Sequence, residues 1–454
     1  MQRRTLAFAA GVCLTSMLLV TVTAHDRPAA QQRGWWQARD PLNVLARSKP
    51  ARSAPSAVTA SRPDSLSQSL GDFLEGERLF DRETFGGNGR TCLTCHSRET
   101  GTVSPAQARV RFRKNAEDPL FVHDGSDDED GDGLGDGRHV TRMLEDATIL
   151  IRIPLHLNVE LKGHPEIREV TVRRGIPTTL NTPALDPVLM LDGRQPTLQT
   201  QALGAITDHA QATRAVTSRE LDLIASFQRT PRFYSSLELL VFAFTGRNPP
   251  ALPQGRTPSE KRGRTFFEDL PPDFSVDPPN FKPGACAACH SGPLLNQTNQ
   301  FLPVPVPPGT RFQTVLVSEF NAAGNPVMQF IFRNQQHDLD PATNRDGTPD
   351  GVIEVSSPDP GRALITGRAD DFVPFPPGSF DQLNAFKISQ LRGIRHTAPY
   401  FHDNSARTLE DVAEHYRKFF LVVSDPDGPG PAGPLVVLSE QDKKDIVAFL
   451  KLLD

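Results

Sequence analysis

The sequence predicts a mainly α fold with two similar halves, long Pro- and Gly-rich loops and a few short strands. Helices are indicated by runs in which apolar residues recur three or four positions apart, several of them opened by a capping residue. Two halves are indicated by a cysteine–histidine motif that occurs twice. Long loops are indicated by 41 prolines and 33 glycines, far too many for a compact helical bundle.

The repeated motif is Cys-x-x-Cys-His, the attachment sequence of a c-type haem. The two thiols of such a motif form thioether bonds to the haem edge, and the histidine becomes the proximal ligand of the iron. The spacing is mechanical, because one short turn has to present two sulfurs and place the imidazole under the iron. We therefore expect two covalently bound haem c groups, one held by Cys92, Cys95 and His96 and the other by Cys286, Cys289 and His290.

A Cys-x-x-Cys pair can also be a redox dithiol, a disulfide or half of a zinc site. Paired zinc knuckles are typically about 15–20 residues apart, whereas nearly two hundred residues separate the two motifs here. The fifth cysteine, Cys13, lies in a segment that we expect to be removed. Every cysteine of the mature chain then belongs to a haem motif, which favours haem over the three alternatives.

The first 24 residues are typical of a secretory signal. Arg3 and Arg4 precede an apolar run from Leu6 to Val22, and small residues around Ala24 form a cleavage site. The alternative is a retained anchor, but polar residues interrupt the run, which is short for a span of roughly 20 residues. Loss of the two arginines takes the formal net charge from −5 to −7. We expect a mildly acidic periplasmic protein with no nucleic-acid footprint and no membrane span after signal removal.

The rest of the chain divides into a lead-in and two haem domains. Residues 25–67 are rich in Ala, Pro, Ser, Arg and Gln and have no sustained apolar period, so we expect a disordered or surface-hugging lead-in. A Pro-rich stretch separates an N-terminal haem domain at 68–245 from a C-terminal one at 256–454. Segments 76–80 and 263–267 precede the two motifs with similar Gly and Phe positions, which indicates an internal repeat.

Apolar periodicity predicts a helix at 70–80, and four capping boxes predict the starts of further helices. The boxes are Thr217-x-x-Glu220, Thr257-x-x-Glu260, Thr408-x-x-Asp411 and Ser439-x-x-Asp442. Short strands are expected at 314–317 and 327–332.

An acidic loop contains Asp128-x-Asp130-x-Asp132-Gly133, the opening half of a calcium-binding loop. The twelfth position, where a bidentate glutamate belongs, is His139. An EF-hand is therefore disfavoured, and a solvated acidic insertion is the simpler interpretation.

Together with the haem motifs, several segments resemble the bacterial dihaem cytochrome c peroxidase and MauG family over about residues 70–454. The resemblance rests on the two motifs with their preceding segments 76–80 and 263–267, on Pro177-Thr-Thr-Leu-Asn181, on Asp192-Gly-Arg194 with Gln201-Ala-Leu-Gly204, and on the run from Leu391 through Thr397, Pro399 and His402 to Val412. It implies two cytochrome c-like haem domains in a haem-dependent oxidoreductase.

In that family, hydrogen peroxide or oxygen reacts at the N-terminal haem, which corresponds here to the haem of His96. The C-terminal haem, here that of His290, receives electrons from a small redox protein such as a cytochrome c or a cupredoxin and passes them on. A calcium ion between the haems is held partly by backbone carbonyls, which would be those of Thr397 and Pro399. Homodimers are common in the family.

The chain departs from the peroxidase pattern at the C-terminal haem. Peroxidases have a methionine ligand fourteen residues after the histidine that matches His402, and Tyr416 stands at that position. MauG-type enzymes use a tyrosinate ligand there, so the resemblance implies Tyr416 as a ligand of the iron. Two alternatives are that Tyr416 simply packs on the apolar face of its helix, or that the neighbouring His415 ligates instead.

Two further departures concern the N-terminal haem. The catalytic glutamate of the peroxidases, ten residues after the glutamine that matches Gln201, is Gln211 here, and an amide cannot shuttle a proton as a carboxylate does. Asp208 or His209 could substitute, although a surface turn would also explain both. The tryptophan that lies between the haems is Leu191 here.

The distal ligand of many resting peroxidases is a histidine upstream of residue 177. His164 is the nearest candidate, with a spacing that does not match, and an open five-coordinate iron is the alternative. We expect a peroxidase-type enzyme with Gln201, His209 and Gln211 as candidate catalytic residues. The alternatives are a dihaem electron carrier and a MauG-like oxidase of an organic or protein substrate.

Overall fold

The computed structural model describes residues 66–122, 140–268, 284, 286–299, 309–335, 351–369, 383–423 and 437–454. The predicted signal at 1–24, residues 25–65 of the predicted lead-in and the acidic loop around Asp128–Asp132 lie outside these residues. The first helix, α1, begins at Leu66, two residues inside the predicted lead-in.

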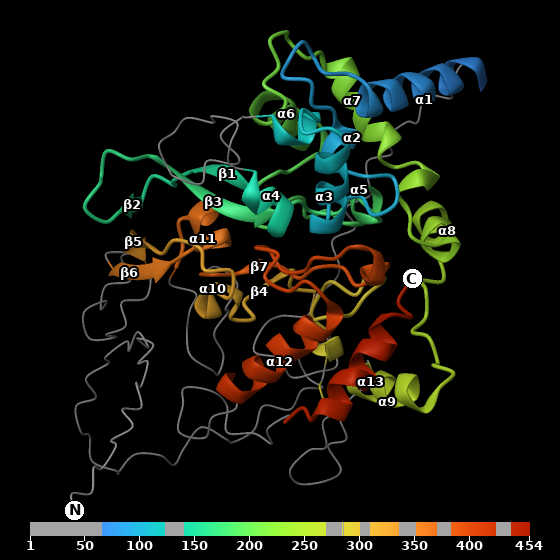
Figure 1. The fold of residues 1–454 in the computed structure, drawn as a ribbon, viewed down its shortest axis with the longest axis vertical. Helices are drawn as coiled ribbons and strands as arrows, with labels where there is room; N and C mark the ends of the chain where they lie inside the picture. Colours follow the sequence, from blue (N-terminus) through green and yellow to red (C-terminus); the bar gives the residue numbers. More distant parts are fainter. Residues whose placement is uncertain are drawn as a thin grey trace, which may run out of the picture. The chain divides into compact units, whose positions relative to one another are not determined.

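Helices predominate in the described residues, and most are short (Figure 1). In the N-terminal half they are α1 (Leu66–Asp81), α2 (Cys92–Cys95), α3 (Pro105–Lys114), α4 (Thr141–Glu145), α5 (Thr182–Leu185), α6 (Leu198–Asp208), α7 (Ser218–Phe227) and α8 (Leu237–Thr245). In the C-terminal half they are α9 (Pro258–Phe267), α10 (Val317–Phe320), α11 (Arg362–Thr366), α12 (Leu409–Val423) and α13 (Glu440–Leu450). Single 3-10 turns are η2 (Pro119–Phe121), η3 (Pro231–Phe233), η4 (Cys286–Ala288) and η5 (Ile394–His396). The predicted mainly α class with a few short strands is confirmed.

All four predicted capping boxes are formed, because the pattern depends only on residues within one turn. In each, the Ser or Thr side chain accepts from the backbone N–H three residues later, and the acidic side chain there bonds back to the backbone N–H of the capping residue. The helix predicted at 70–80 lies within α1.

The strands form three small antiparallel sheets. They are β1 (Thr148–Pro154) with β3 (Glu169–Gly175), β2 (Val159–Leu161) with β5 (Met328–Gln335) and β6 (Gly351–Ser357), and β4 (Phe312–Gln313) with β7 (Phe386–Lys387). The strand predicted at 327–332 is confirmed by β5. The strand predicted at 314–317 is wrong: the Thr314 hydroxyl accepts from the Leu316 N–H in a turn, and Val317 begins α10.

One sheet joins the two halves of the sequence. Strand β2 comes from the N-terminal half, and its Val159 pairs with Phe332 of β5. Ile153 and Val172 of the β1–β3 pair bury their side chains in the same core as Phe332 and Leu364. The boundary predicted between domains at 68–245 and 256–454 is therefore crossed by a shared apolar core, and the boundary itself stays a prediction.

Each haem motif is preceded by a helix that crosses another at a glycine. Helix α1 contacts α7, and α9 contacts α13, as Figure 1 also shows. A Cβ on Gly76 would lie 2.7 Å from the Leu223 carbonyl oxygen and 2.9 Å from the Phe227 Cβ. A Cβ on Gly263 would lie 1.9 Å from the Asp445 carbonyl oxygen. The internal repeat thus encodes two close helix crossings that only glycine permits.

The Gly263→Ala variant is expected to destabilise the protein by about 1–3 kcal/mol, the usual cost of overpacking. The added methyl group would collide with the backbone of α13 and force the two helices apart. Gly71→Ala is the matched control, because a Cβ there meets nothing within 4 Å, and alanine is about 1 kcal/mol more favourable than glycine in a helix. Urea unfolding of the holoprotein measures both, and equal effects would contradict the prediction.

Among the described residues, no helix combines the length and the apolarity needed to cross a membrane.

Candidate active site

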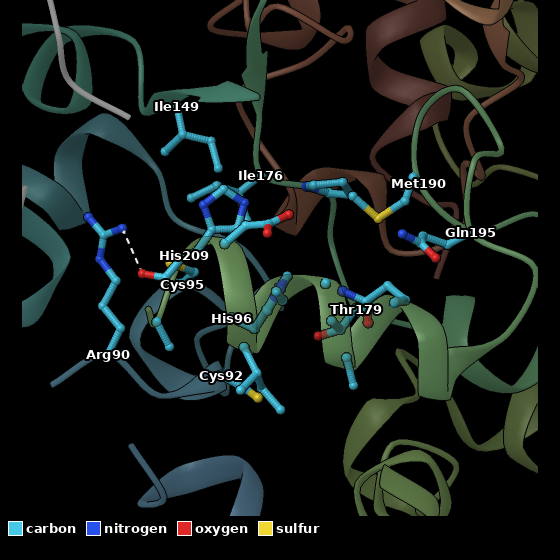
Figure 2. Close-up of a pocket in the computed structure, with 18 of the residues that line it drawn as sticks. Arg90, Cys92, Cys95, His96, Ile149, Ile176, Thr179, Met190, Gln195 and His209 are labelled. Carbon is cyan, nitrogen blue, oxygen red and sulfur yellow. Dashed lines mark hydrogen bonds between the residues drawn. The ribbon is translucent and has the colours of Figure 1, made fainter. Parts of the chain in front are cut away.

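A cavity of about 380 Å³ lies at the first haem motif. This volume falls in the range of small-molecule sites, roughly 300–1,000 Å³. Its wall is formed by α2, the β1–β3 pair, the Met190–Gln195 turn and α6 with the turn that follows it. In the view of Figure 2, His96 lies between Arg90 on one side and Met190 and Gln195 on the other.

The first motif folds as its spacing requires. Helix α2 is a single turn that carries Cys92 and Cys95, and Thr91 and Thr94 close a capping box at its start. The His96 ring lines the cavity, and its Nδ1 lies 2.8 Å from the Gly101 carbonyl oxygen. A carbonyl can only accept, so Nδ1 carries the proton and Nε2 is left with the lone pair that a metal requires.

The titration of the motif residues also favours haem ligation over dithiol chemistry. Burial raises the pKa of Cys92 and of Cys286 to about 12 and that of Cys289 to about 11. Reactive dithiols instead lower a thiol pKa so that the thiolate attacks. Burial lowers the pKa of His96, so the ring stays neutral and able to bind iron.

The remaining alternatives find no support in the described residues. No disulfide joins any of the four motif cysteines. No group of three or more His, Cys, Asp or Glu side chains in the described parts of the chain could hold a metal ion such as zinc.

The cavity wall suits a haem, which combines an apolar macrocycle with two carboxylates. Most of the wall is apolar and comes from several elements, including Ile149, Ile151, Ile176, Leu198, Ala202 and Ile206. Arg152, an exposed residue of β1, adds a positive charge that can pair with a propionate. Cys92, Cys95 and His96 would hold the group, and the other residues enclose it.

The structure brings the three predicted catalytic residues to this cavity. Gln201 lies on α6, His209 is the C-cap of that helix, and Gln211 follows in the left-handed conformation with φ of 51°. The Gln211 side-chain oxygen accepts from the Asn88 amide at 3.3 Å. Asp208 also lines the cavity, is exposed, and accepts from the Thr207 hydroxyl at 3.2 Å.

Arg90 holds the turn that carries His209. Its side chain is 4% exposed and donates to four carbonyl oxygens, among them that of His209 at 3.3 Å (Figure 2). The Asn88 amide donates to the same oxygen at 2.9 Å. These bonds fix the backbone of the turn that carries the His209 side chain.

Two residues considered for the N-terminal haem lie elsewhere. His164 is exposed in the connection between β2 and β3, 3.3 Å from the Glu166 carboxylate, and does not line the cavity. Leu191 is half-buried, and its carbonyl oxygen accepts from the Lys387 N–H at 2.7 Å. Lys387 lines the cavity, although it belongs to the C-terminal half.

The second motif is arranged like the first. Turn η4 begins at Cys286 and Cys289 directly follows it, and the Nδ1 of His290 donates to the Leu295 carbonyl oxygen at 2.9 Å. Burial raises the pKa of Tyr416, and the thiols of Cys289 and Cys286 raise it further. Tyr416 is therefore within electrostatic range of the second haem motif.

The other candidates in this half have different surroundings. His415 is buried, its Nε2 donates to the Val315 carbonyl oxygen at 2.7 Å, and its ring packs on Phe401 at 4.4 Å. This geometry favours Tyr416 over His415 as a ligand. Thr397 and Pro399, the residues expected at a calcium ion, follow η5, and the Thr397 hydroxyl donates to the Ile394 carbonyl oxygen.

Sequence reasoning missed several residues of the cavity wall, among them Met190 and Lys387. Met190 lies two residues before the Asp192-Gly-Arg194 segment, and that adjacency is a signal by which it could have been found. No motif marks Lys387, whose ammonium group bonds to the Asp186 carboxylate at 3.1 Å and to the Val188 carbonyl at 3.0 Å. Burial lowers its pKa, and Asp186 opposes that effect. Only the tertiary fold places this lysine at the first haem motif.

No family model matches the chain. Among curated proteins, it is similar to cytochrome-c peroxidase IdrP1 of Denitromonas iodatirespirans, with 26% identity over 171 residues. The similarity covers 37% of this chain and 36% of that protein, so it spans about a third of the relative's length.

Two solved structures are also similar. One is a MauG-like protein associated with microbial copper homeostasis, at 20% identity and TM-score 0.42, covering 87% of this chain and 91% of that chain. The other is a tyrosine-to-methionine variant of the diheme peroxidase BthA from Burkholderia thailandensis, at 17% identity and TM-score 0.38, covering 86% of each chain. With its two haem motifs and its sequence similarity to a cytochrome-c peroxidase, this chain resembles the dihaem cytochrome c peroxidase and MauG family.

Proposed function

We propose that this chain is a periplasmic dihaem c-type oxidoreductase that reduces hydrogen peroxide, or uses it as an oxidant, at the haem of His96. The observation that carries the proposal is that one cavity collects Cys92, Cys95 and His96 together with Gln201, His209 and Gln211. When bound, the haem supplies an iron that can bind peroxide and exchange electrons. Reduction of peroxide consumes two electrons and two protons and yields two waters.

The side chains around the haem would have different roles in hydrogen bonding and proton transfer. The amides of Gln201 and Gln211 can donate hydrogen bonds to peroxide and accept them, but they cannot take up a proton. The imidazole of His209 can hold and release a proton at a ring nitrogen, which makes it the candidate general acid and base. The apolar wall excludes water and strengthens these polar contacts.

The haem of His290 would relay electrons from a small redox protein, a cytochrome c or a cupredoxin. Tyr416, which is within electrostatic range of Cys286 and Cys289, would be its second iron ligand, and an anionic oxygen ligand lowers the reduction potential of a haem relative to a thioether. Together with Gln211 in place of a carboxylate, this observation favours a second candidate function: a MauG-like reaction in which peroxide oxidises an organic or protein substrate. A calcium ion on Thr397 and Pro399 and a homodimer remain part of the proposal.

A spectroscopic peroxide titration of the ferric holoprotein, with electron paramagnetic resonance before and after, tests the proposal. One high-spin haem that responds to peroxide is the expected result. Oxidation of added reduced cytochrome c would then identify a peroxidase, and its absence would favour the MauG-like reaction. Two low-spin haems that ignore peroxide would overturn the proposal and leave an electron carrier.

The Tyr416→Phe variant is expected to raise the reduction potential of the His290 haem, on the order of 100 mV, because axial ligands set haem potentials over a wide range. Spectroelectrochemical titration of the holoprotein measures the potential. Tyr234→Phe, which removes a tyrosine hydroxyl in the N-terminal half, should leave it unchanged. An unchanged potential in Tyr416→Phe would show that Tyr416 does not ligate the iron.

A further inference from the structure

The position of Met190 in the cavity wall is built into the fold. It lies in a tight turn closed by an antiparallel bridge between Leu189 and Gln195, and it adopts φ of 65°. The left-handed conformation is costly for a residue with a side chain and persists only where the surroundings impose it. The turn is anchored through Asp192, whose buried carboxylate bonds to Arg174 at 2.5 Å and to Arg194 at 2.9 Å.

The chemistry of the wall leaves few side chains that an oxidant can attack. Neither tryptophan nor tyrosine is among the described residues of the wall, whose aromatic rings are those of Phe80, Phe85, His96 and His209. Two methionines are present, and methionine thioethers are oxidised readily to sulfoxides. Met143 is 1% exposed and packs in an apolar core, whereas Met190 is only half-buried. Of the two methionine side chains in the wall, Met190 is therefore the more accessible to a molecule in this cavity.

We propose that Met190 is an oxidative modification site: peroxide activated at the His96 haem converts its thioether to the sulfoxide when no electron donor is present. This inference rests on the proposed function. The O–O bond of peroxide breaks, one oxygen bonds to sulfur, and the other leaves as water with both peroxide protons. Sulfur loses two electrons and peroxide gains them. No other reductant is needed.

If Met190 is oxidised in this way, it competes with the electron donor for the oxidant. An electron donor and Met190 draw on the same oxidising equivalents, so a reduced donor protects the thioether. Each molecule can consume one equivalent in this way, after which a polar oxygen lies in the apolar wall.

The test treats ferric holoprotein with equimolar hydrogen peroxide, with and without reduced cytochrome c, and maps methionine oxidation by peptide mass spectrometry. Met328 of β5 is the matched control, because it is also half-buried but does not line the cavity. Without donor, Met190 is expected to gain one oxygen about tenfold more than Met328, following its access to the oxidant. Reduced cytochrome c should abolish that difference, and Met143 should remain unmodified.

The haem absorption spectrum, recorded in the same samples, distinguishes failure of the Met190 inference from failure of the proposed function. If the spectrum responds to peroxide but Met190 gains no more oxygen than Met328, the inference is overturned and the proposed function stands. If the spectrum ignores peroxide, the proposed function fails. Oxidation of Met190 at the rate of Met328 would then remove the inference as well.

Discussion

Replacing His96 by glycine is expected to lower peroxide turnover by about 100-fold or more, which corresponds to about 2.7 kcal/mol of lost transition-state stabilisation. The imidazole at the first motif is the residue placed to ligate the iron, because its Nδ1 is occupied by the Gly101 carbonyl and its Nε2 is free to bind. Cys92 and Cys95 remain, so under the proposed function the variant would keep both covalent haems. The spectrum of the His290 haem should therefore be unchanged.

Two controls make this result specific. His290→Gly removes the corresponding ligand of the second haem and should leave the spectral response of the first haem to peroxide intact. Added imidazole should restore part of the turnover of His96→Gly, since a free ligand can enter the space that the ring vacates. Full turnover in His96→Gly without imidazole would mean that peroxide reacts elsewhere.

The parts of the fold that were predicted correctly depend on short stretches of sequence. A capping box needs only a Ser or Thr and an acidic residue three positions later, so the starts of α7, α9, α12 and α13 were all predicted. The repeated glycines at 76 and 263 were visible as a pattern. Their physical role, the backbone contact at Leu223 and Asp445, required the structure.

The features that were missed depend on distant residues. Strand β2 is three residues long and pairs with β5, more than 160 positions away, so no local periodicity marks it. Thr314 and Leu316 are residue types that are common in strands. The Thr314 hydroxyl, however, accepts a hydrogen bond from the Leu316 N–H, and the chain forms a turn there. Lys387 reaches the first haem motif from the other half of the chain for the same reason: only tertiary packing brings it there.

In the candidate site, too, the features encoded within a short stretch could be predicted, and those that depend on distant residues could not. The two haem-attachment sites could be predicted from the Cys-x-x-Cys-His motifs, because haem attachment requires a fixed spacing within five residues. Gln201 and Gln211 were candidates because of a resemblance, and His209 because it is close to Gln211 in the sequence; the structure places all three at one cavity. His164 was a candidate by sequence position alone, and the β2–β3 connection carries it away from that cavity. Position along the chain does not determine position in space.

The two halves of the chain are also joined by a buried ion network centred on Arg174. Its guanidinium is 1% exposed and forms two bonds to the Asp359 carboxylate, at 2.7 and 2.9 Å, and one to Asp192 at 2.5 Å. Asp192 has a second cation in Arg194, and the two arginines hold its pKa below the usual range. The charges of Arg174, Arg194, Asp192 and Asp359 therefore balance. Among the ion pairs of the described residues, Asp359 has only Arg174 as a cation.

The Arg174→Leu variant is expected to destabilise the protein by about 3–5 kcal/mol, because it leaves the Asp359 carboxylate buried without its partner. The matched control is Arg98→Ala. It also removes an arginine from a buried carboxylate, but Asp81 keeps Arg232 at 2.8 Å and Arg98 is half exposed, so a loss below about 1 kcal/mol is expected.

Urea unfolding of the holoprotein measures both free energies, and the double variant Arg174→Leu, Asp359→Leu should recover part of the loss, since it removes the uncompensated charge. A small effect in Arg174→Leu, no larger than that of Arg98→Ala, would mean that water or a rearranged side chain reaches Asp359. Recovery in the double variant would locate the cost in the stranded carboxylate. The ion network would then tie the Asp192 turn, and with it Met190 at the cavity wall, to the C-terminal half of the chain.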